Sequence, residues 1–78
     1  MGDPASAQKR GLEALEKARP LDKAGRTKEA AVLYKEHIAC FQVALRAPDL
    51  SPAMRNILSE SAREWQKRVT EIESQQQQ

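Results

Sequence analysis

The sequence holds one histidine and one cysteine, His37 and Cys40, and their spacing would place both side chains on one face of a helix. An imidazole and a thiol on one face of a helix can bind the same metal ion, or can act together as general base and nucleophile. A structural metal site needs about four ligands, and a nucleophile pair needs a third group to orient the base. The chain offers neither, so we predict no metal, no cofactor and no enzyme.

The remaining polar pairs favour surface roles over chemistry. Glu13 with Lys17, and Glu64 with Arg68, stand four residues apart, which on a helix gives surface ion pairs that contribute about 0.2–0.5 kcal/mol each. Gly25 stands alone and does not form a phosphate-binding loop. A binding module is therefore favoured over a catalyst.

Length and charge exclude several classes of function. A chain of 78 residues holds one domain, and its 13 basic and 11 acidic residues give a formal net charge of +2 without a strongly basic segment. Nucleic acid usually needs a concentrated basic face, so we expect no nucleic-acid partner. No apolar run approaches the roughly 18 residues that span a bilayer, so we expect membranes to be met only indirectly. With one cysteine no internal disulfide forms, which favours a reducing, cytoplasmic compartment.

The elements that position these residues are three helices. Asp3 and Pro4 begin the first, since Asp caps free N–H groups and Pro fits the first turn. Gly25 ends it as a C-terminal cap. Pro20 interrupts its apolar stripe and either kinks the helix or divides it in two, and we expect a kink because the stripe continues beyond it. The stripe comprises Leu12, Ala14, Leu15, Ala18, Leu21 and Ala24.

The second helix is predicted to start at a Thr27 cap and to lie at the centre, because it carries two apolar stripes. The broad stripe comprises Ala30, Leu33, Tyr34, Ile38, Phe41 and Leu45, and the second stripe Val32, Ala39 and Val43. Ser51 and Pro52 begin the third helix, again as a cap followed by proline. Its stripe comprises Met54, Leu58, Ser61, Ala62, Trp65, Val69 and Ile72.

The three helices have short connections, which predicts an all-α, antiparallel up-down-up three-helix bundle. We place the domain at residues 1–74 and a polar glutamine-rich tail at 75–78. The core is predicted to bury one set of residues together: Tyr34, Ile38, Phe41, Leu58, Trp65 and Val69.

The segment "ALEKARPLDKAGRTKEAAVLYKEHIACFQVAL" resembles the first two helices of the MIT (microtubule-interacting and trafficking) domain. The residues that carry the resemblance are Ala18, Asp22, Gly25, Glu29, Ala30, Tyr34 and Ile38, followed in helix three by Trp65, Arg68, Val69 and Ile72. It extends without gaps over residues 12–72. A tetratricopeptide repeat shares part of the pattern, but one repeat cannot bury its own face. For Asp22 three roles stay open: an exposed carboxylate, an acceptor for backbone N–H groups at the turn, or the partner of a cation on helix three.

The resemblance implies a site that binds short linear motifs of partner proteins. The motif lies as an amphipathic helix between helices two and three, or as an extended strand between helices one and three. The first groove carries over to Ala39, Gln42, Val43, Arg63, Gln66 and Lys67, and the alternative groove to Leu15, Arg19 and Thr70. Where ATPases of the family carry two leucines and an aspartate, this chain has Gln42, Gln66 and Lys67. We therefore expect either an acidic peptide in the first groove or use of the other groove.

The predicted function is a monomeric, non-catalytic adaptor domain that binds a short peptide motif, such as the tail of an ESCRT-III subunit. It would recruit a larger host protein from the cytoplasm to endosomal or autophagic membranes. One alternative is a structural bundle that self-associates, or docks within its host protein, through Val32, Ala39 and Val43. Another is binding to microtubules or acidic lipid through basic side chains, namely Lys9, Arg10, Lys67 and Arg68.

Overall fold

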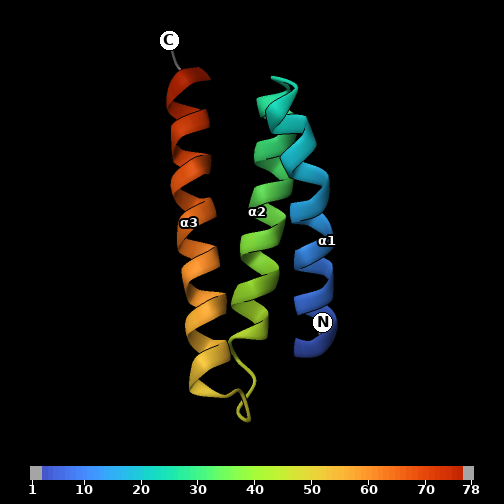
Figure 1. The fold of residues 1–78 in the computed structure, drawn as a ribbon, viewed down its shortest axis with the longest axis vertical. Helices are drawn as coiled ribbons and strands as arrows, with labels where there is room; N and C mark the ends of the chain where they lie inside the picture. The colour runs from blue at the N-terminus through green and yellow to red at the C-terminus, as the bar shows by residue number, and fades with distance from the viewer. Residues whose placement is uncertain (1–2, 77–78) are drawn as a thin grey trace.

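The computed structural model describes residues 3–76 as three helices. Helix α1 spans Pro4–Lys23, α2 spans Thr27–Ala44 and α3 spans Pro52–Gln76. Figure 1 shows them running up, down and up, so the predicted all-α three-helix bundle is confirmed. Helix α3 includes the first two residues of the predicted tail, and residues 77–78 lie outside the described part of the chain.

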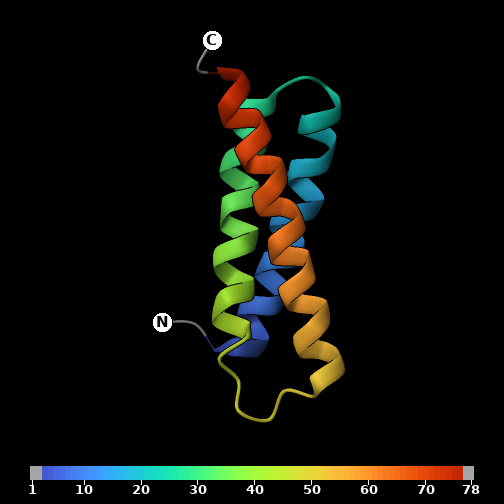
Figure 2. The same ribbon diagram turned by 90° about the vertical axis from the view of Figure 1, so that its left-hand side faces the viewer.

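Helix α2 is the central element. Both α1 and α3 pack against it, whereas the Cα atoms of α1 and α3 stay more than 8 Å apart throughout the described residues. Figure 2, turned so that α3 is in front, shows α2 on one side of it and the upper part of α1 on the other, with α1 passing behind α3 lower down. Direct contact between α1 and α3 is therefore made by side chains alone.

Two of the predicted helix starts are confirmed. The Asp3 carboxylate accepts a hydrogen bond from the Ser6 backbone N–H at 3.4 Å, and Pro4 is the first residue of α1. Ser51 Oγ accepts from the Met54 N–H at 3.2 Å ahead of α3. In each case a side-chain oxygen satisfies an N–H group that has no partner within its helix.

The turn between α1 and α2 depends on Gly25, which has a φ of 83°. Its N–H donates to the Asp22 carbonyl at 3.1 Å and the Arg26 N–H donates to the Leu21 carbonyl at 2.9 Å, the paired bonds of a Schellman motif. The predicted cap at Thr27 is wrong. Arg26 is the N-cap residue without a side-chain bond, because the chain leaves the Schellman turn directly into the helix.

The apolar core is divided into two clusters along the bundle. The upper cluster comprises Ala18, Ala30, Ala31, Tyr34, Ile38, Val69 and Ile72. The lower cluster comprises Ala7, Phe41, Ala44 and Leu58. Five of the six predicted core residues are buried, but not as one set, and Trp65 is only partly buried at the margin of the upper cluster. The single core with a buried tryptophan was therefore wrong in these two respects.

Helix α2 is central for a different reason than the one predicted. Most of the second apolar stripe does not pack on a neighbour, because Val32 is 66% exposed and Ala39 is also exposed, and of the three residues only Val43 lies partly buried against the lower cluster. Helix α2 packs on α3 through small and aliphatic residues of another edge. These include Ala31 and Ile38, which lie in the upper cluster together with residues of α3. In α1, the predicted stripe residue Leu12 is likewise exposed, and Gly11 beside it is buried.

Pro20 lies inside α1, which continues as one helix to Lys23, so the alternative of two separate helices is excluded. Pro20 has no N–H to give to the Glu16 carbonyl, but both residues lie on the exposed side of α1. Water can therefore reach the free carbonyl, which limits the cost of the missing bond.

We expect Pro20→Ala to raise the melting temperature, because alanine restores the hydrogen bond to the Glu16 carbonyl and removes the steric conflict of the ring. The gain is at most about 3 kcal/mol, the cost of proline in a helix interior, and smaller this close to the helix end. Thermal melts followed by circular dichroism provide the measurement. A lower melting temperature would mean that the proline ring is needed to seat the last turn of α1.

Candidate functional site

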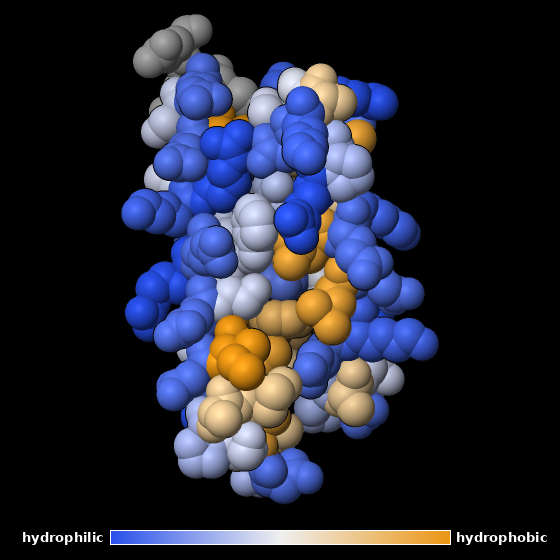
Figure 3. Space-filling view, in the orientation of Figure 1, coloured by the Kyte–Doolittle hydropathy of each residue, from blue (hydrophilic) through white to orange (hydrophobic). Residues whose placement is uncertain are grey.

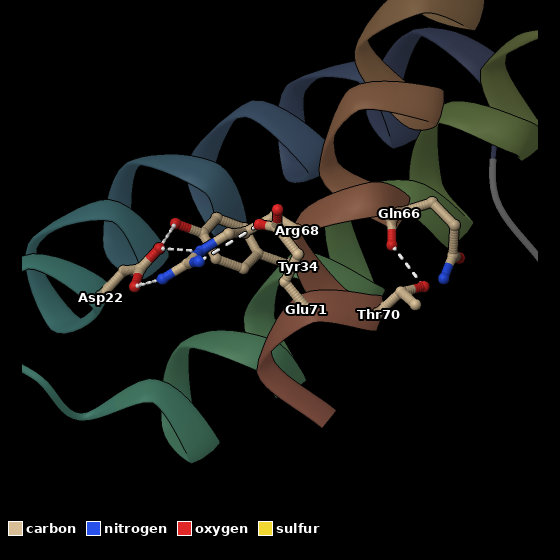
Figure 4. A network of polar contacts seen from close by, with 6 residues as sticks. All are labelled: Asp22, Tyr34, Gln66, Arg68, Thr70 and Glu71. Atoms are coloured by element: carbon tan, nitrogen blue, oxygen red, sulfur yellow. Dashed lines mark hydrogen bonds and ion pairs between the residues drawn. The ribbon is translucent and has the colours of Figure 1, made fainter. Parts of the chain in front are cut away.

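A polar network at the upper end of the bundle joins all three helices (Figure 4). The Asp22 carboxylate of α1 accepts hydrogen bonds from Tyr34 Oη of α2 at 2.8 Å, and from Arg68 Nε and Nη2 of α3 at 2.9 and 2.7 Å. Of the three roles open for Asp22, the partner of a cation on helix three is the one observed. Both bonds to Arg68 are charge-assisted and use the fork of the guanidinium, which makes them strong and directional.

The network changes the acid–base properties of its members. The hydrogen bond from Arg68 is the main cause that lowers the pKa of Asp22 below its ordinary value of 3.8. Burial, together with the hydrogen bond to Asp22, raises the pKa of Tyr34 to about 12. Asp22 is therefore a carboxylate and Tyr34 a neutral phenol at physiological pH. The Tyr34 ring also stacks on Trp65 at 4.7 Å between ring centroids, so Trp65 covers the network from α3.

A second polar bridge lies between the two apolar clusters. His37 of α2 is fully buried, with Nδ1 at 2.8 Å from the Gly11 carbonyl of α1 and Nε2 at 3.0 Å from Ser61 Oγ of α3. A carbonyl only accepts, so Nδ1–H donates to Gly11, and Nε2 of the neutral ring accepts from the Ser61 hydroxyl. His37 therefore has a structural role, joining α2 to both of its neighbours.

Close approach of α1 to α2 allows this bridge to form. A Cβ atom on Gly11 would lie 2.7 Å from Cδ1 of the Phe41 ring and 3.2 Å from Cβ of Cys40. No side chain fits there without displacing the ring, so glycine brings its own carbonyl within reach of His37. Burial lowers the pKa of His37 below 6.5, and the bond to Gly11 offsets part of that effect. Within the described residues, no buried side-chain nitrogen or oxygen lacks a partner.

The α2–α3 seam, the first of the two predicted binding faces, is marked by an ion pair between Lys35 and Glu73. Gln42 follows Lys35 by two turns and Gln66 precedes Glu73 by two turns, so each glutamine lies on the edge of its own helix that borders this seam. Five of the six residues predicted for this face are exposed, namely Ala39, Gln42, Arg63, Gln66 and Lys67, whereas Val43 is partly buried against the lower cluster.

The residues predicted for the alternative groove do not lie together. Leu15 is partly buried against the upper cluster and Arg19 is exposed on α1. Thr70 follows Arg68 by two residues and projects to the other side of α3, where its hydroxyl donates to the Gln66 carbonyl at 3.1 Å. Figure 4 shows Thr70 beside Gln66 and far from Asp22. The structure therefore places Thr70 on the seam side of α3 and not against α1.

Two residues that sequence reasoning did not assign to a site mark the face between α1 and α3. Leu12 is 46% exposed and Ile57 is 57% exposed. Ile57 precedes Arg68 by three turns, so it lies on the α1 side of α3. On the outer side of α2, Arg10 and Lys17 of α1 line a small cleft together with Leu33 of α2. Leu12 points away from this edge of α1. Leu12 therefore faces toward α3.

The helices α1 and α3 run parallel, so residues three turns below Asp22 and Arg68 lie at the same level. Leu12 and Ile57 therefore flank one stretch of the α1–α3 face, which we define by Leu12, Leu15, Met54, Ile57 and Ser61. Figure 3 shows apolar side chains gathered in the lower half of the molecule on the side where α3 and α1 face the viewer. A sequence signal for Ile57 existed, because it stands one position off the apolar stripe of α3.

Comparison with known proteins agrees with this architecture. Residues 9–74 match the family described as MIT (microtubule interacting and transport) domain. The chain belongs to the MIT family. No curated protein and no solved structure matches it. The MIT domain is a non-catalytic module, generally a protein-interaction module of trafficking proteins, and MIT domains typically bind peptide motifs such as those of ESCRT-III.

Two structural findings bear on other classes of function. No group of three or more His, Cys, Asp or Glu side chains in the described part of the chain is arranged to hold a metal ion. None of the helices described is long and apolar enough to cross a membrane.

We expect Arg68→Lys to destabilise the MIT domain by about 1–3 kcal/mol, because an ammonium cannot reproduce the two parallel hydrogen bonds of the guanidinium fork to Asp22 and leaves the carboxylate short of a partner. Denaturant unfolding measures the change. Arg63→Lys is the matched control, since Arg63 is exposed on the same helix and should change stability by less than about 0.5 kcal/mol. Equal effects of the two substitutions would contradict the role assigned to the network.

Acid should weaken the fold through His37, the only histidine in the chain. The folded pKa lies below 6.5, whereas the unfolded chain takes up a proton near its usual value of about 6.5. The stabilisation is therefore complete above about pH 6.5 and is lost as the pH falls from there toward the folded pKa. The melting temperature should drop from about pH 7.5 to about pH 5.5.

The His37→Gln variant is the control for this pH dependence. It should melt at a lower temperature but show little change across the same range, because ordinary carboxylates titrate at lower pH. Asp22 adds a further loss only below its unfolded value near 3.8. An equally steep dependence in the variant would exclude His37 as the cause.

Proposed function

We propose that this MIT domain binds a short peptide motif of a partner protein and thereby recruits its host protein to trafficking machinery, with ESCRT-III-like tails as the leading partners. The observation that carries the proposal is the pair of exposed apolar residues, Leu12 and Ile57, across the α1–α3 face. A role at endosomal or autophagic membranes, reached from the cytoplasm, belongs to the same proposal.

The shape of the α1–α3 face favours an extended peptide. The α1 and α3 backbones do not pack directly on each other, so the space between them is filled and bordered by side chains. An extended segment laid between them would cover Leu12 and Ile57 together. Complete burial of such a side chain contributes about 1.5–3 kcal/mol, so covering two half-exposed ones supplies a useful part of the affinity for a weak motif. The Asp22–Arg68 pair closes the upper end and limits where a motif can lie.

The α2–α3 seam has less support as a site for the helical leucine-rich motifs. Gln42 and Gln66 give no apolar lining, and Lys67 would repel the arginine that such motifs present. We therefore propose that helical ESCRT-III tails bind weakly there, and that the α1–α3 face is the main peptide site.

Self-association, the second candidate function, rests on Val32, Ala39 and Val43. Of these three residues, Val32 alone is both large and exposed. Ala39 is small, and Val43 is partly buried. A single aliphatic side chain is a narrow basis for a dimer interface. We propose that the domain is a monomer.

The double variant Leu12→Ser with Ile57→Ser should weaken peptide binding about tenfold, since it removes the apolar cover on both helices. Titration of labelled ESCRT-III tails, first chosen as binders from a panel, supplies the measurement. Val32→Ser is the matched control: it removes an aliphatic side chain that is still more exposed but lies on α2, and it should leave affinity within about twofold. Equal loss in both variants, or unchanged binding in the double variant, would exclude the α1–α3 face as the site.

A further inference from the structure

A pocket of about 410 Å³ opens at the lower end of the bundle. The start of α1, the end of α2 and the loop that leads to α3 meet there, and Figure 2 shows this loop below the ends of α1 and α2. None of the five residues that define the α1–α3 face lines it. A pocket of this size can hold a side chain or a small molecule.

Most of the pocket wall is apolar. Ala44 belongs to the lower core cluster and Leu50 packs against that cluster, so the pocket opens directly onto the core. The other apolar residues of the wall are alanines and prolines, whose side chains are too short to fill the space between the three segments. The apolar residues of the wall are Pro4, Ala5, Ala44, Ala47, Pro48 and Leu50.

The charged residues of the lining are both acidic. Asp3 comes from the start of α1 and Asp49 from the loop, and neither a lysine nor an arginine lines the pocket. Asp3 accepts hydrogen bonds from the Ser6 N–H and hydroxyl at Oδ2, both at 3.4 Å, so Oδ1 has no partner among the described residues. Asp49 takes part in none of the ion pairs between described residues. Both aspartates are exposed, which places their charges toward the open side of the pocket.

Neighbouring groups leave the pocket acidic. The nearest cations in the sequence are Arg46 and Arg55, and neither belongs to the lining. Arg55 is engaged by the carbonyls of Leu45 and Ala47, at 3.1 and 3.5 Å. The end of α2 adds a partial negative charge, whereas the partial positive charge at the start of α1 is already compensated by the Asp3 cap.

We propose that this pocket binds the side chain of a lysine or arginine residue of a partner protein. The methylene groups of such a side chain pack on the apolar wall, and its cationic head group reaches Asp3 and Asp49 at the open side. Arginine suits the pocket better than lysine, because a guanidinium is less strongly hydrated and has enough donors for two carboxylates. The pocket is a second binding site, separate from the α1–α3 face.

Two other occupants fit the lining less well. Calcium takes six to eight oxygen ligands, and no group of three or more His, Cys, Asp or Glu side chains in the described part of the chain is arranged to hold a metal ion. A purely apolar side chain would match the wall, but it would shield the two carboxylates from water without offering them a donor.

The test is a titration of the ¹⁵N-labelled domain with N-acetyl-arginine amide, followed by NMR. The amide signals of Gln8 and Leu50, which line the pocket, should shift, and those of Leu12 and Ile57 should not. One side chain with exposed ion pairs gives little affinity, so the dissociation constant should lie in the millimolar range. N-acetyl-citrulline amide is the neutral isostere and should bind about fivefold more weakly, because it forms no ion pair.

The double variant Asp3→Asn with Asp49→Asn should weaken binding of N-acetyl-arginine amide about fivefold. Asparagine caps a helix as well as aspartate does, so the start of α1 is preserved. Glu13→Gln with Glu16→Gln removes the same charge from exposed positions of α1 and should change the affinity by less than about twofold.

The variant Ala5→Leu tests the pocket itself. Ala5 is an exposed residue of the lining, and leucine is a good helix former, so the variant should fold while its larger side chain takes up part of the space. Binding should fall about fivefold or more. The double variant Leu12→Ser with Ile57→Ser should bind N-acetyl-arginine amide normally, which separates this site from the α1–α3 face.

Several outcomes would overturn the proposal. Equal binding of N-acetyl-citrulline amide would exclude the carboxylates as the cause. Equal loss in the two charge-removing double variants would show that net charge alone is responsible. Unchanged binding in Ala5→Leu, or no shift at Gln8 and Leu50 at millimolar concentrations of N-acetyl-arginine amide, would exclude the pocket as the site.

Discussion

The carboxylate of Asp22 is shared by all three helices of this MIT domain. The α1 and α3 backbones do not pack on each other, so the hydrogen bonds from Tyr34 and Arg68 are the direct polar connection between the three at the upper end. His37 makes an equivalent connection half-way down the bundle. A small domain with a thin, divided core has little stability to spare, so two bridges with fixed geometry select one arrangement of the helices.

The faces of the domain follow from these bridges. Helix α2 lies at the centre. Helices α1 and α3 each pack on α2 and not on each other, so each has an edge that no other helix covers. On the side closed above by Arg68, the surface between α1 and α3 carries Leu12 and Ile57 and is apolar. On the other side of α3, the seam with α2 is polar at Gln42 and Gln66.

Local signals in the sequence predicted well wherever local physics decides the outcome. Helix starts at Asp3 and Ser51 and the glycine turn at Gly25 were found, because caps depend on a few consecutive residues. The prediction failed at Thr27, where the geometry of the preceding turn took precedence over the propensity of the residue. It also failed at Trp65, because the 3.6-residue period shows which side of a helix faces inward but not how deeply each position is buried.

By itself, the sequence determined the helices, their order, the bundle and the family, because apolar period, caps and the spaced set from Ala18 to Ile72 all act along the chain. Only the tertiary structure decided which partners met across it. It brought Gly11, His37 and Ser61 together and set Thr70 beside Gln66 instead of against α1. Contacts between helices depend on rotation and register, and a one-residue rotation of about 100° moves a side chain to another face.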